Sequence, residues 1–200
     1  MIEEHYFTRK PSSSHEKIGF TARLRGNELV FLSSSGVFSK KKADLGSRVL
    51  IENCQVADNQ KVLDLGCSIG VVGLSIARAF PSCAIFMTDI NERAVGLAKQ
   101  NAKANGIANV TILQGSVFAP VKNEKFDVIL LNPPQTAGKK LCFEMIEQSR
   151  KHLNKDGSLQ LVARHQKGGR TLESKMEEVF GNVSVLAKSG GYRVYISKLL

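Results

Sequence analysis

The sequence predicts an α/β protein with a doubly wound, mostly parallel β-sheet. Strand-like and helix-like segments alternate from Val62 onward, which is typical of a parallel sheet with helices on both faces. At the start of this region an apolar strand, Val62–Leu65, runs through a turn of small residues into a segment with helical spacing, Val71–Phe80. Alternating apolar residues between Ile18 and Phe31 add a β-hairpin ahead of the sheet.

The length of 200 residues allows one α/β domain with little left for a second. We expect a single domain over 1–200, with an arm and hairpin in 1–35 and the core in 36–200. No membrane span is expected, because no run of about 18 apolar residues occurs, and the N-terminus lacks the apolar segment of a signal peptide. The four cysteines form no Cys-x-x-Cys pair, so they favour reduced thiols in a cytoplasmic protein over disulfides or a zinc site. They are Cys54, Cys67, Cys83 and Cys142.

The formal net charge of +10 is concentrated at the two ends of the chain. Residues 1–48 contribute +4 and residues 136–200 contribute +6, whereas residues 49–135 hold seven residues of each sign. Basic flanks around a neutral middle favour a phosphate-bearing partner such as a nucleic acid, because clustered cations attract polyanions. A basic surface without a specific partner is the alternative.

The first 53 residues predict an arm, a hairpin and a short helix. Residues 1–17 are polar, which favours an extended arm. Apolar residues alternate over 18–24 and again after the turn at Arg25–Asn27, which is the pattern of two paired strands. Residues 47–53 have the apolar spacing of a helix.

Apolar runs and turn signals then predict the rest of the core. The expected strands cover residues 62–65, 84–88, 110–113, 126–131, 158–163, 183–187 and 192–197. The expected helices cover residues 71–80, 94–104, 138–153 and 171–180. A turn at Asn154–Gly157 is expected before the strand at 158–163.

The glycine-rich turn after the first core strand predicts a nucleotide-cofactor site. Its spacing is Gly66-x-x-x-Gly70-x-x-Gly73, with Ser68 between, whereas a dinucleotide fingerprint requires G-x-G-x-x-G. Asp64 lies just before the turn, where its charge would repel a pyrophosphate. The pattern favours a cofactor with a cationic or polar amino-acid end over a dinucleotide. A tight turn without a ligand is the alternative.

Two further polar residues follow the next strands. Asp89 comes directly after the apolar run at 84–88, where nucleotide-binding folds hold ribose hydroxyls. A carboxylate can accept hydrogen bonds from both vicinal hydroxyls, which explains the residue type. Ser116 follows the strand at 110–113, near the expected place of an adenine ring.

The sequence Asn132-Pro133-Pro134 directly follows the strand at 126–131. Its two prolines restrict the backbone, so the Asn132 side chain and the Pro133 carbonyl are held rigidly. These two oxygens could accept both N–H bonds of one planar amino group and direct its lone pair at an electrophile. No His or Asp adjoins this segment, so we expect no base there. A proline-stiffened loop without chemistry is the alternative.

Taken together, these blocks resemble the S-adenosylmethionine-dependent amino-N-methyltransferases. More narrowly, the chain resembles the small-subunit ribosomal RNA guanine-N2 methyltransferases in a single-domain form. The matching blocks are Gly36–Ser39, Val62–Gly70, Asp89–Asn91, Asn132–Pro134, Ala137–Lys139 and Gly190–Val194. The resemblance implies a Rossmann-like class I methyltransferase fold, with seven strands in the order 3-2-1-4-5-7-6 and the last-threaded strand antiparallel. It also implies S-adenosylmethionine as cofactor, ribosomal RNA as partner and no metal.

The resemblance assigns roles to individual residues. The residues expected in catalysis are Asn132, Pro133 and Pro134. The expected cofactor-binding residues are Phe38, Asp64, Gly66, Cys67, Ser68, Gly70, Asp89, Ile90, Ser116, Val117 and Asn132. Within this set Asp64, Gly66 and Gly70 would flank the methionine moiety, Asp89 the ribose, and Ser116 and Val117 the adenine. The expected substrate-binding residues are Lys40, Lys41, Lys42, Gln135, Lys139, Arg164 and Arg170.

Three positions depart from the family pattern. Ser68 replaces a glycine and fits the turn if its φ is negative. Ser116 stands where the family usually has an acidic acceptor for the adenine amino group. Gln135 stands where many related enzymes have an aromatic residue that stacks on the target base, which leaves Phe38 or Phe118 to do so.

Two other functions fit the same sequence. An enzyme that methylates a glutamine side chain of a protein would share the Asn-Pro-Pro sequence. A methyltransferase-fold RNA-binding protein without activity would tolerate the three departures. The basic flanks favour RNA over a protein substrate, and the intact Asp64, Asp89 and Asn132 favour an active enzyme.

Overall fold

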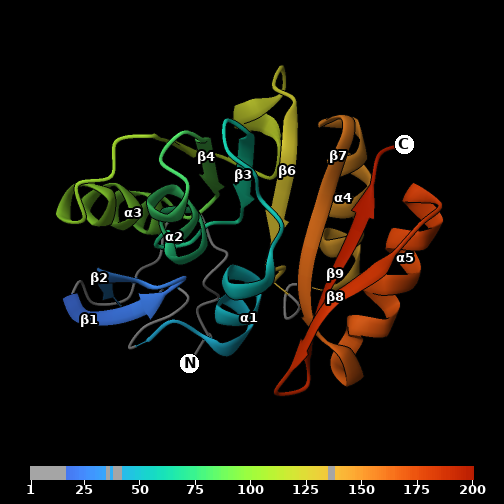
Figure 1. The fold of residues 1–200 in the computed structure, drawn as a ribbon, viewed down its shortest axis with the longest axis horizontal. Coiled ribbons are helices and arrows are strands. Elements are labelled where there is room, and N and C mark those ends of the chain that lie inside the picture. Colours follow the sequence, from blue (N-terminus) through green and yellow to red (C-terminus); the bar gives the residue numbers. More distant parts are fainter. Residues whose placement is uncertain (1–16, 35–36, 38–41, 135–137) are drawn as a thin grey trace.

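The computed structural model describes residues 17–34, 37, 42–134 and 138–200. Seven of its strands form one sheet in the order β5-β4-β3-β6-β7-β9-β8, which in chain order is 3-2-1-4-5-7-6 (Figure 1). All neighbouring strands are parallel except β9, which runs antiparallel to β7 and β8. This confirms the predicted sheet. The strands are β3 (Lys61–Leu65), β4 (Ala84–Asp89), β5 (Val110–Gln114), β6 (Phe126–Leu131), β7 (Leu153–Arg164), β8 (Ser184–Ser189) and β9 (Tyr192–Lys198).

Helices cover both faces of the sheet, as Figure 1 shows. One face packs against α1 (Leu45–Asn53), α2 (Val71–Ala79) and α3 (Glu92–Ala104), and the other against α4 (Lys139–Lys151) and α5 (Arg170–Phe180). The central strands β3 and β6 are buried almost throughout, which is why they read as continuous apolar runs. No helix in the described part of the chain is long and apolar enough to span a membrane.

The predicted N-terminal hairpin is present as β1 (Lys17–Leu24) and β2 (Asn27–Ser34), and it packs beside α3. Two asparagines one helical turn apart take the place of a neighbouring strand. Asn101 accepts from the Leu32 nitrogen at 2.7 Å and donates to the Leu32 oxygen at 3.1 Å. Asn105 makes the same pair of bonds to Val30 at 3.0 and 2.8 Å. These contacts satisfy backbone groups at the edge of β2 that would otherwise be unpaired.

The predicted turn at Asn154–Gly157 lies inside β7 rather than before it. Phe126 pairs with Leu153, but Val128 pairs with Ser158, so the four residues between bulge out of the ladder. Asn154 Nδ2 donates to Asp127 Oδ1 at 2.7 Å and holds the bulge against β6. β7 therefore begins five residues earlier than the apolar pattern indicates.

Strand register brings the carboxyl ends of the central strands together. Leu65 of β3 pairs with Thr88 of β4 on one side and with Leu131 of β6 on the other. The turn after β3, the end of β4 and the Asn132-Pro133-Pro134 segment after β6 therefore meet at one edge of the sheet. In open α/β sheets this edge is where ligands bind.

Candidate functional site

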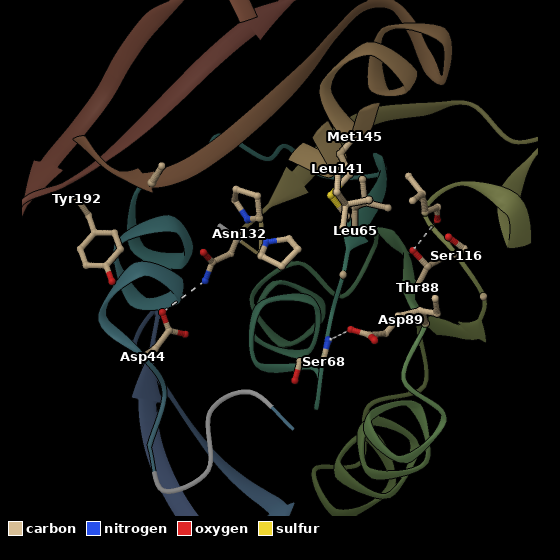
Figure 2. Close-up of a pocket in the computed structure, with 17 residues that line it drawn as sticks. Asp44, Leu65, Ser68, Thr88, Asp89, Ser116, Asn132, Leu141, Met145 and Tyr192 are labelled. Atoms are coloured by element: carbon tan, nitrogen blue, oxygen red, sulfur yellow. Dashed lines mark hydrogen bonds between the residues drawn. The ribbon is translucent and has the colours of Figure 1, made fainter. Parts of the chain in front are cut away.

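A cavity of about 380 Å³ lies at the carboxyl ends of β3, β4 and β6 (Figure 2). Its volume and its mix of apolar walls with a few polar groups are typical of small-molecule sites. The residues that line it are Asp44, Leu65, Gly66, Ser68, Thr88, Asp89, Ile90, Gly115, Ser116, Val117, Asn132, Pro133, Pro134, Leu141, Met145, Ala163 and Tyr192. In the described part of the chain, no three His, Cys, Asp or Glu side chains are grouped as metal ligands.

Asp64 lies behind the turn and does not line the cavity. It is 3 % exposed, and its Oδ2 accepts from the Gly73 nitrogen at 2.7 Å, in the first turn of α2. Burial raises the pKa of Asp64 to about 7; the hydrogen bond from Gly73 opposes this rise and the charge of Asp89 adds to it. Asp64 thus caps α2 from the neighbouring strand, instead of flanking a ligand as the resemblance implied.

The turn itself is built on left-handed residues. Gly66 and Gly70 have φ of 77° and 91°, and a Cβ on Gly70 would lie 2.9 Å from both Leu74 and Met87. Ser68 has φ of 50°, so the expectation of a negative φ at this position is wrong. The turn demands the conformation of a glycine there, and the serine adopts it at a cost. Gly66 and Ser68 line the cavity, whereas Cys67 and Gly70 lie outside its lining.

Asp89 is fixed at the tip of β4 by two backbone donors. Its Oδ2 accepts from the Ser68 nitrogen and its Oδ1 from the Asn91 nitrogen, both at 2.8 Å. Burial raises its pKa, and these hydrogen bonds oppose the rise. The carboxylate lines the cavity beside Ile90.

Ser116 and Val117 close the end of the cavity beyond β4 and β5. Ser116 is exposed, and Val117 has φ of 46°, with its carbonyl accepting from Thr88 Oγ1 at 3.5 Å. In Figure 2, Ser116, Thr88, Asp89 and Ser68 lie on one side of the cavity, and Asn132, Asp44 and Tyr192 lie on the other. The residues expected around the cofactor and around the target amine are therefore separated along one cavity.

The Asn132 side chain faces the first turn of α1. Its Nδ2 donates to Ser47 Oγ at 3.1 Å and to Asp44 Oδ1 at 3.4 Å. The expectation that no Asp lies beside the Asn-Pro-Pro segment is therefore wrong, because Asp44 approaches it from another element. Neither Asp44 nor Ser47 stands out in the sequence except as a start signal of α1, where Asp44 Oδ1 accepts from the Ser47 nitrogen at 3.0 Å.

The aromatic contact with a target base was expected from Phe38 or Phe118. Phe118 is 2 % exposed and stacks on His152 with ring centroids 4.3 Å apart, so it is a core residue and that prediction is wrong. Phe38 lies outside the described residues. Among the described lining residues, Tyr192 supplies the aromatic ring, and the Arg164 guanidinium lies 5.2 Å from its centroid.

Three of the expected substrate-binding residues stand at the rim of the cavity. Lys42, Lys139 and Arg164 are exposed, and each is within two positions of a lining residue, namely Asp44, Leu141 and Ala163. Lys40, Lys41 and Gln135 lie outside the described residues.

Arg170 belongs to a basic group beside the end of β7. Its Nε donates to Nε2 of the buried His165 at 3.0 Å, and His165 Nδ1 lies 2.8 Å from the Tyr195 hydroxyl. Burial, followed by the charges of Arg193 and Arg170, lowers the pKa of His165. Arg193 pairs in register with the cavity residue Ala163 on β7 and with Lys188 on β8. Sequence reasoning missed Lys188 and Arg193, which only strand pairing brings to this edge.

Comparison with known proteins agrees with this geometry. The family model described as "Methyltransferase small domain" matches residues 28–196. The uncharacterized protein YbxB of Bacillus subtilis is 42 % identical over 199 residues, covering 98 % of this chain and 99 % of its own length. The ribosomal RNA small subunit methyltransferase C of Cronobacter sakazakii is 31 % identical over 88 % of this chain, but this chain spans only 52 % of that protein.

Among solved structures, a T. thermophilus 16S rRNA N2 methyltransferase (RsmC) in complex with AdoMet and guanosine superposes with a TM-score of 0.82 at 25 % identity. The match covers 95 % of this chain and 52 % of that one. A family model that matches most of the chain, a shared fold and a cavity at the expected sheet edge lead to one assignment. This chain belongs to the methyltransferase small domain family, and it is homologous to RsmC over most of its length.

Proposed function

We propose that this protein transfers a methyl group from S-adenosylmethionine to the N2 amine of guanine in ribosomal RNA. The observation that carries the proposal is the placement of Asn132-Pro133-Pro134 on the same cavity as Asp89 and Ser68. The chain's relatives support the choice of acceptor, because those with a named activity are ribosomal RNA methyltransferases. They share about half of their length with this chain, so the acceptor is a proposal for this protein.

The cavity suits the proposed cofactor at its end beyond β4. Asp89 presents a carboxylate held by two backbone donors, which is the acceptor that a pair of ribose hydroxyls requires. Ser116 and Val117 would hold the adenine, and Gly66 and Ser68 the methionine moiety. When bound, S-adenosylmethionine supplies an electrophilic methyl group.

The opposite end supplies the groups that an amine acceptor needs. The Asn132 side-chain oxygen and the Pro133 carbonyl would accept the two N–H bonds of the amine, which draws its lone pair out of conjugation with the ring. Leu65, Leu141 and Met145 form an apolar wall that excludes water from this part of the cavity. The amine can lose its proton to water after methylation, so no general base is needed before that step.

The charge around the cavity favours RNA over a protein acceptor. Arg164, Arg170, Lys188 and Arg193 gather at the ends of β7, β8 and β9, with Glu173 as the nearby carboxylate that acts on His165. None of these four cations forms an ion pair with a described carboxylate. A flexible polyanion can satisfy several such cations at once.

The test is methylation of protein-free small-subunit ribosomal RNA with labelled S-adenosylmethionine, followed by mass spectrometry of the nucleosides. We expect N2-methylguanosine, and a rise in melting temperature with S-adenosylmethionine but not with NAD. Asn132→Ala should cut the rate by roughly 10²–10³ with nearly unchanged cofactor affinity. Asn53→Ala, at the end of α1, is the matched control, since it removes only a bond to the Val49 carbonyl.

Three results would contradict the proposal. Methylation of a glutamine-containing ribosomal protein instead of RNA would assign a different acceptor. Binding of RNA without methylation and without a cofactor-induced melting shift would indicate an inactive binding protein. A wild-type rate in Asn132→Ala would make Asn132-Pro133-Pro134 a structural turn.

A further inference from the structure

The first turn of α1 holds the Asn132 amide from one side only. Asp44 Oδ1 and Ser47 Oγ both lie within hydrogen-bond reach of Asn132 Nδ2, at 3.4 and 3.1 Å. Figure 2 shows the amide nitrogen turned toward Asp44. No described residue donates to the Asn132 side-chain oxygen.

The chemistry of the two partners decides which way the amide points. An ionised carboxylate has only acceptor atoms, so the amide must present its N–H₂ group to Asp44. The opposite orientation would place the amide oxygen against the carboxylate and would leave the Ser47 hydroxyl as its only donor. The orientation with the nitrogen toward α1 is therefore strongly favoured, and the oxygen is left on the other side.

We propose that Asp44 and Ser47 are positioning residues that keep the Asn132 oxygen available to the amine that is methylated. This inference rests on the proposed function, and it adds two residues that act through Asn132 without touching the transferred methyl group. A flipped amide would present N–H₂ to the N–H₂ of the acceptor, two donors facing each other. Such a site would still bind the cofactor but would not align the amine.

The surrounding structure makes this turn rigid. Asp44 Oδ1 also accepts from the Ser47 nitrogen at 3.0 Å, so the same oxygen caps α1 and faces Asn132. Ser47 is 4 % exposed, and Val49, Leu50 and Ile51 anchor the helix in the core. A Cβ on Gly46 would come within 2.9 Å of the Tyr192 ring and 3.1 Å of Asp44 Oδ1, so the turn is closely packed on both sides.

The decisive variants remove the acceptor and leave the helix intact. Ser47→Ala deletes only the hydroxyl, Ser47→Thr restores one, and Asp44→Ser keeps a good helix cap with a side chain too short to reach Asn132. We expect Ser47→Ala and Asp44→Ser to lower kcat by roughly 10–10² while KM for RNA and the affinity for S-adenosylmethionine change less than about twofold; this is smaller than the loss of a polar group in direct contact. Ser47→Thr should recover most of the rate.

A double-mutant cycle separates positioning from general stability. If Ser47 acts through Asn132, Ser47→Ala should have almost no effect on the rate in an Asn132→Ala background. A full additional loss in that background would overturn the proposal, and so would an equal loss in cofactor affinity and kcat.

A second readout needs no acceptor and so survives failure of the proposed function. In side-chain amide NMR spectra, we expect the Asn132 N–H₂ signals of the wild-type protein to be well dispersed and slow to exchange. Ser47→Ala should shift them and speed their exchange, while the Asn101 signals, which come from another buried amide, stay unchanged. Unchanged Asn132 signals in Ser47→Ala would show that α1 does not hold the amide.

Discussion

The backbone nitrogen of Ser68 donates to Oδ2 of Asp89 at 2.8 Å, and this bond joins the turn after β3 to the tip of β4 (Figure 2). The Asn91 nitrogen binds the other carboxylate oxygen at the same distance. The carboxylate is thus oriented before any ligand arrives, which lowers the entropy cost of binding.

Replacement of Asp89 tests its role toward the cofactor. Asp89→Ala should weaken S-adenosylmethionine binding by roughly 1.5–3 kcal/mol, the scale of hydrogen bonds to a charged group. Isothermal titration calorimetry measures the change. Asp58→Ala is the control, because Asp58 is exposed and binds only the Ser82 hydroxyl. Equal affinity in the wild type and Asp89→Ala would remove Asp89 from the cofactor site.

Asp64 should make stability depend on pH. Its pKa is raised from 3.8 to about 7 in the folded state, mainly by burial. Between these values the unfolded chain releases the proton while the folded protein keeps it, so stability falls as pH rises through this window.

Asp64→Asn removes that dependence and keeps an acceptor for the Gly73 nitrogen. We expect the stability of the variant relative to the wild type to rise across the window by roughly 1–4 kcal/mol, and to be constant on either side of it. Urea unfolding at pH values below, within and above the window measures the difference. A difference that is flat with pH would show that Asp64 ionises at its ordinary pKa.

Ser68→Gly should stabilise the protein slightly. The positive φ of Ser68 costs roughly 1–2 kcal/mol for a residue with a Cβ, and the greater freedom of glycine in the unfolded chain returns part of that gain. A net gain of up to about 1 kcal/mol is expected from urea unfolding, with cofactor affinity retained because the backbone donor to Asp89 remains. Destabilisation would mean that the serine hydroxyl contributes more than the strain costs.

The basic group at the ends of β8 and β9 should contact RNA phosphates. Lys188→Glu and Arg193→Glu should each weaken RNA binding, and the matching neutral variants should lower the slope of log K against log salt by about 0.7–0.9 per lost contact. Lys99→Glu and Lys103→Glu on the exposed side of α3 carry the same charge changes away from the cavity. Equal effects of the two pairs would indicate attraction by net charge alone.

Most of the fold could be predicted from the sequence, because its signals are local. The apolar runs that become β3 and β6, the helical spacing after Gly70 and the position of Asp89 at a strand end depend only on neighbouring residues. These same signals placed Asn132 at the carboxyl edge of the sheet. The bulge in β7 was missed because pairing with β6, and not local preference, decides where that strand begins.

The sequence by itself determined the sheet, the hairpin and the two ends of the cavity, since each follows from periodicity and turn residues. Only the tertiary structure decided which side chains meet. Asp44 is 88 residues from Asn132 and reaches it because α1 packs across the sheet edge. Asp64 turns inward to cap α2, and Phe118 enters the core, because burial and hydrogen bonding at those places depend on distant segments that no local pattern describes.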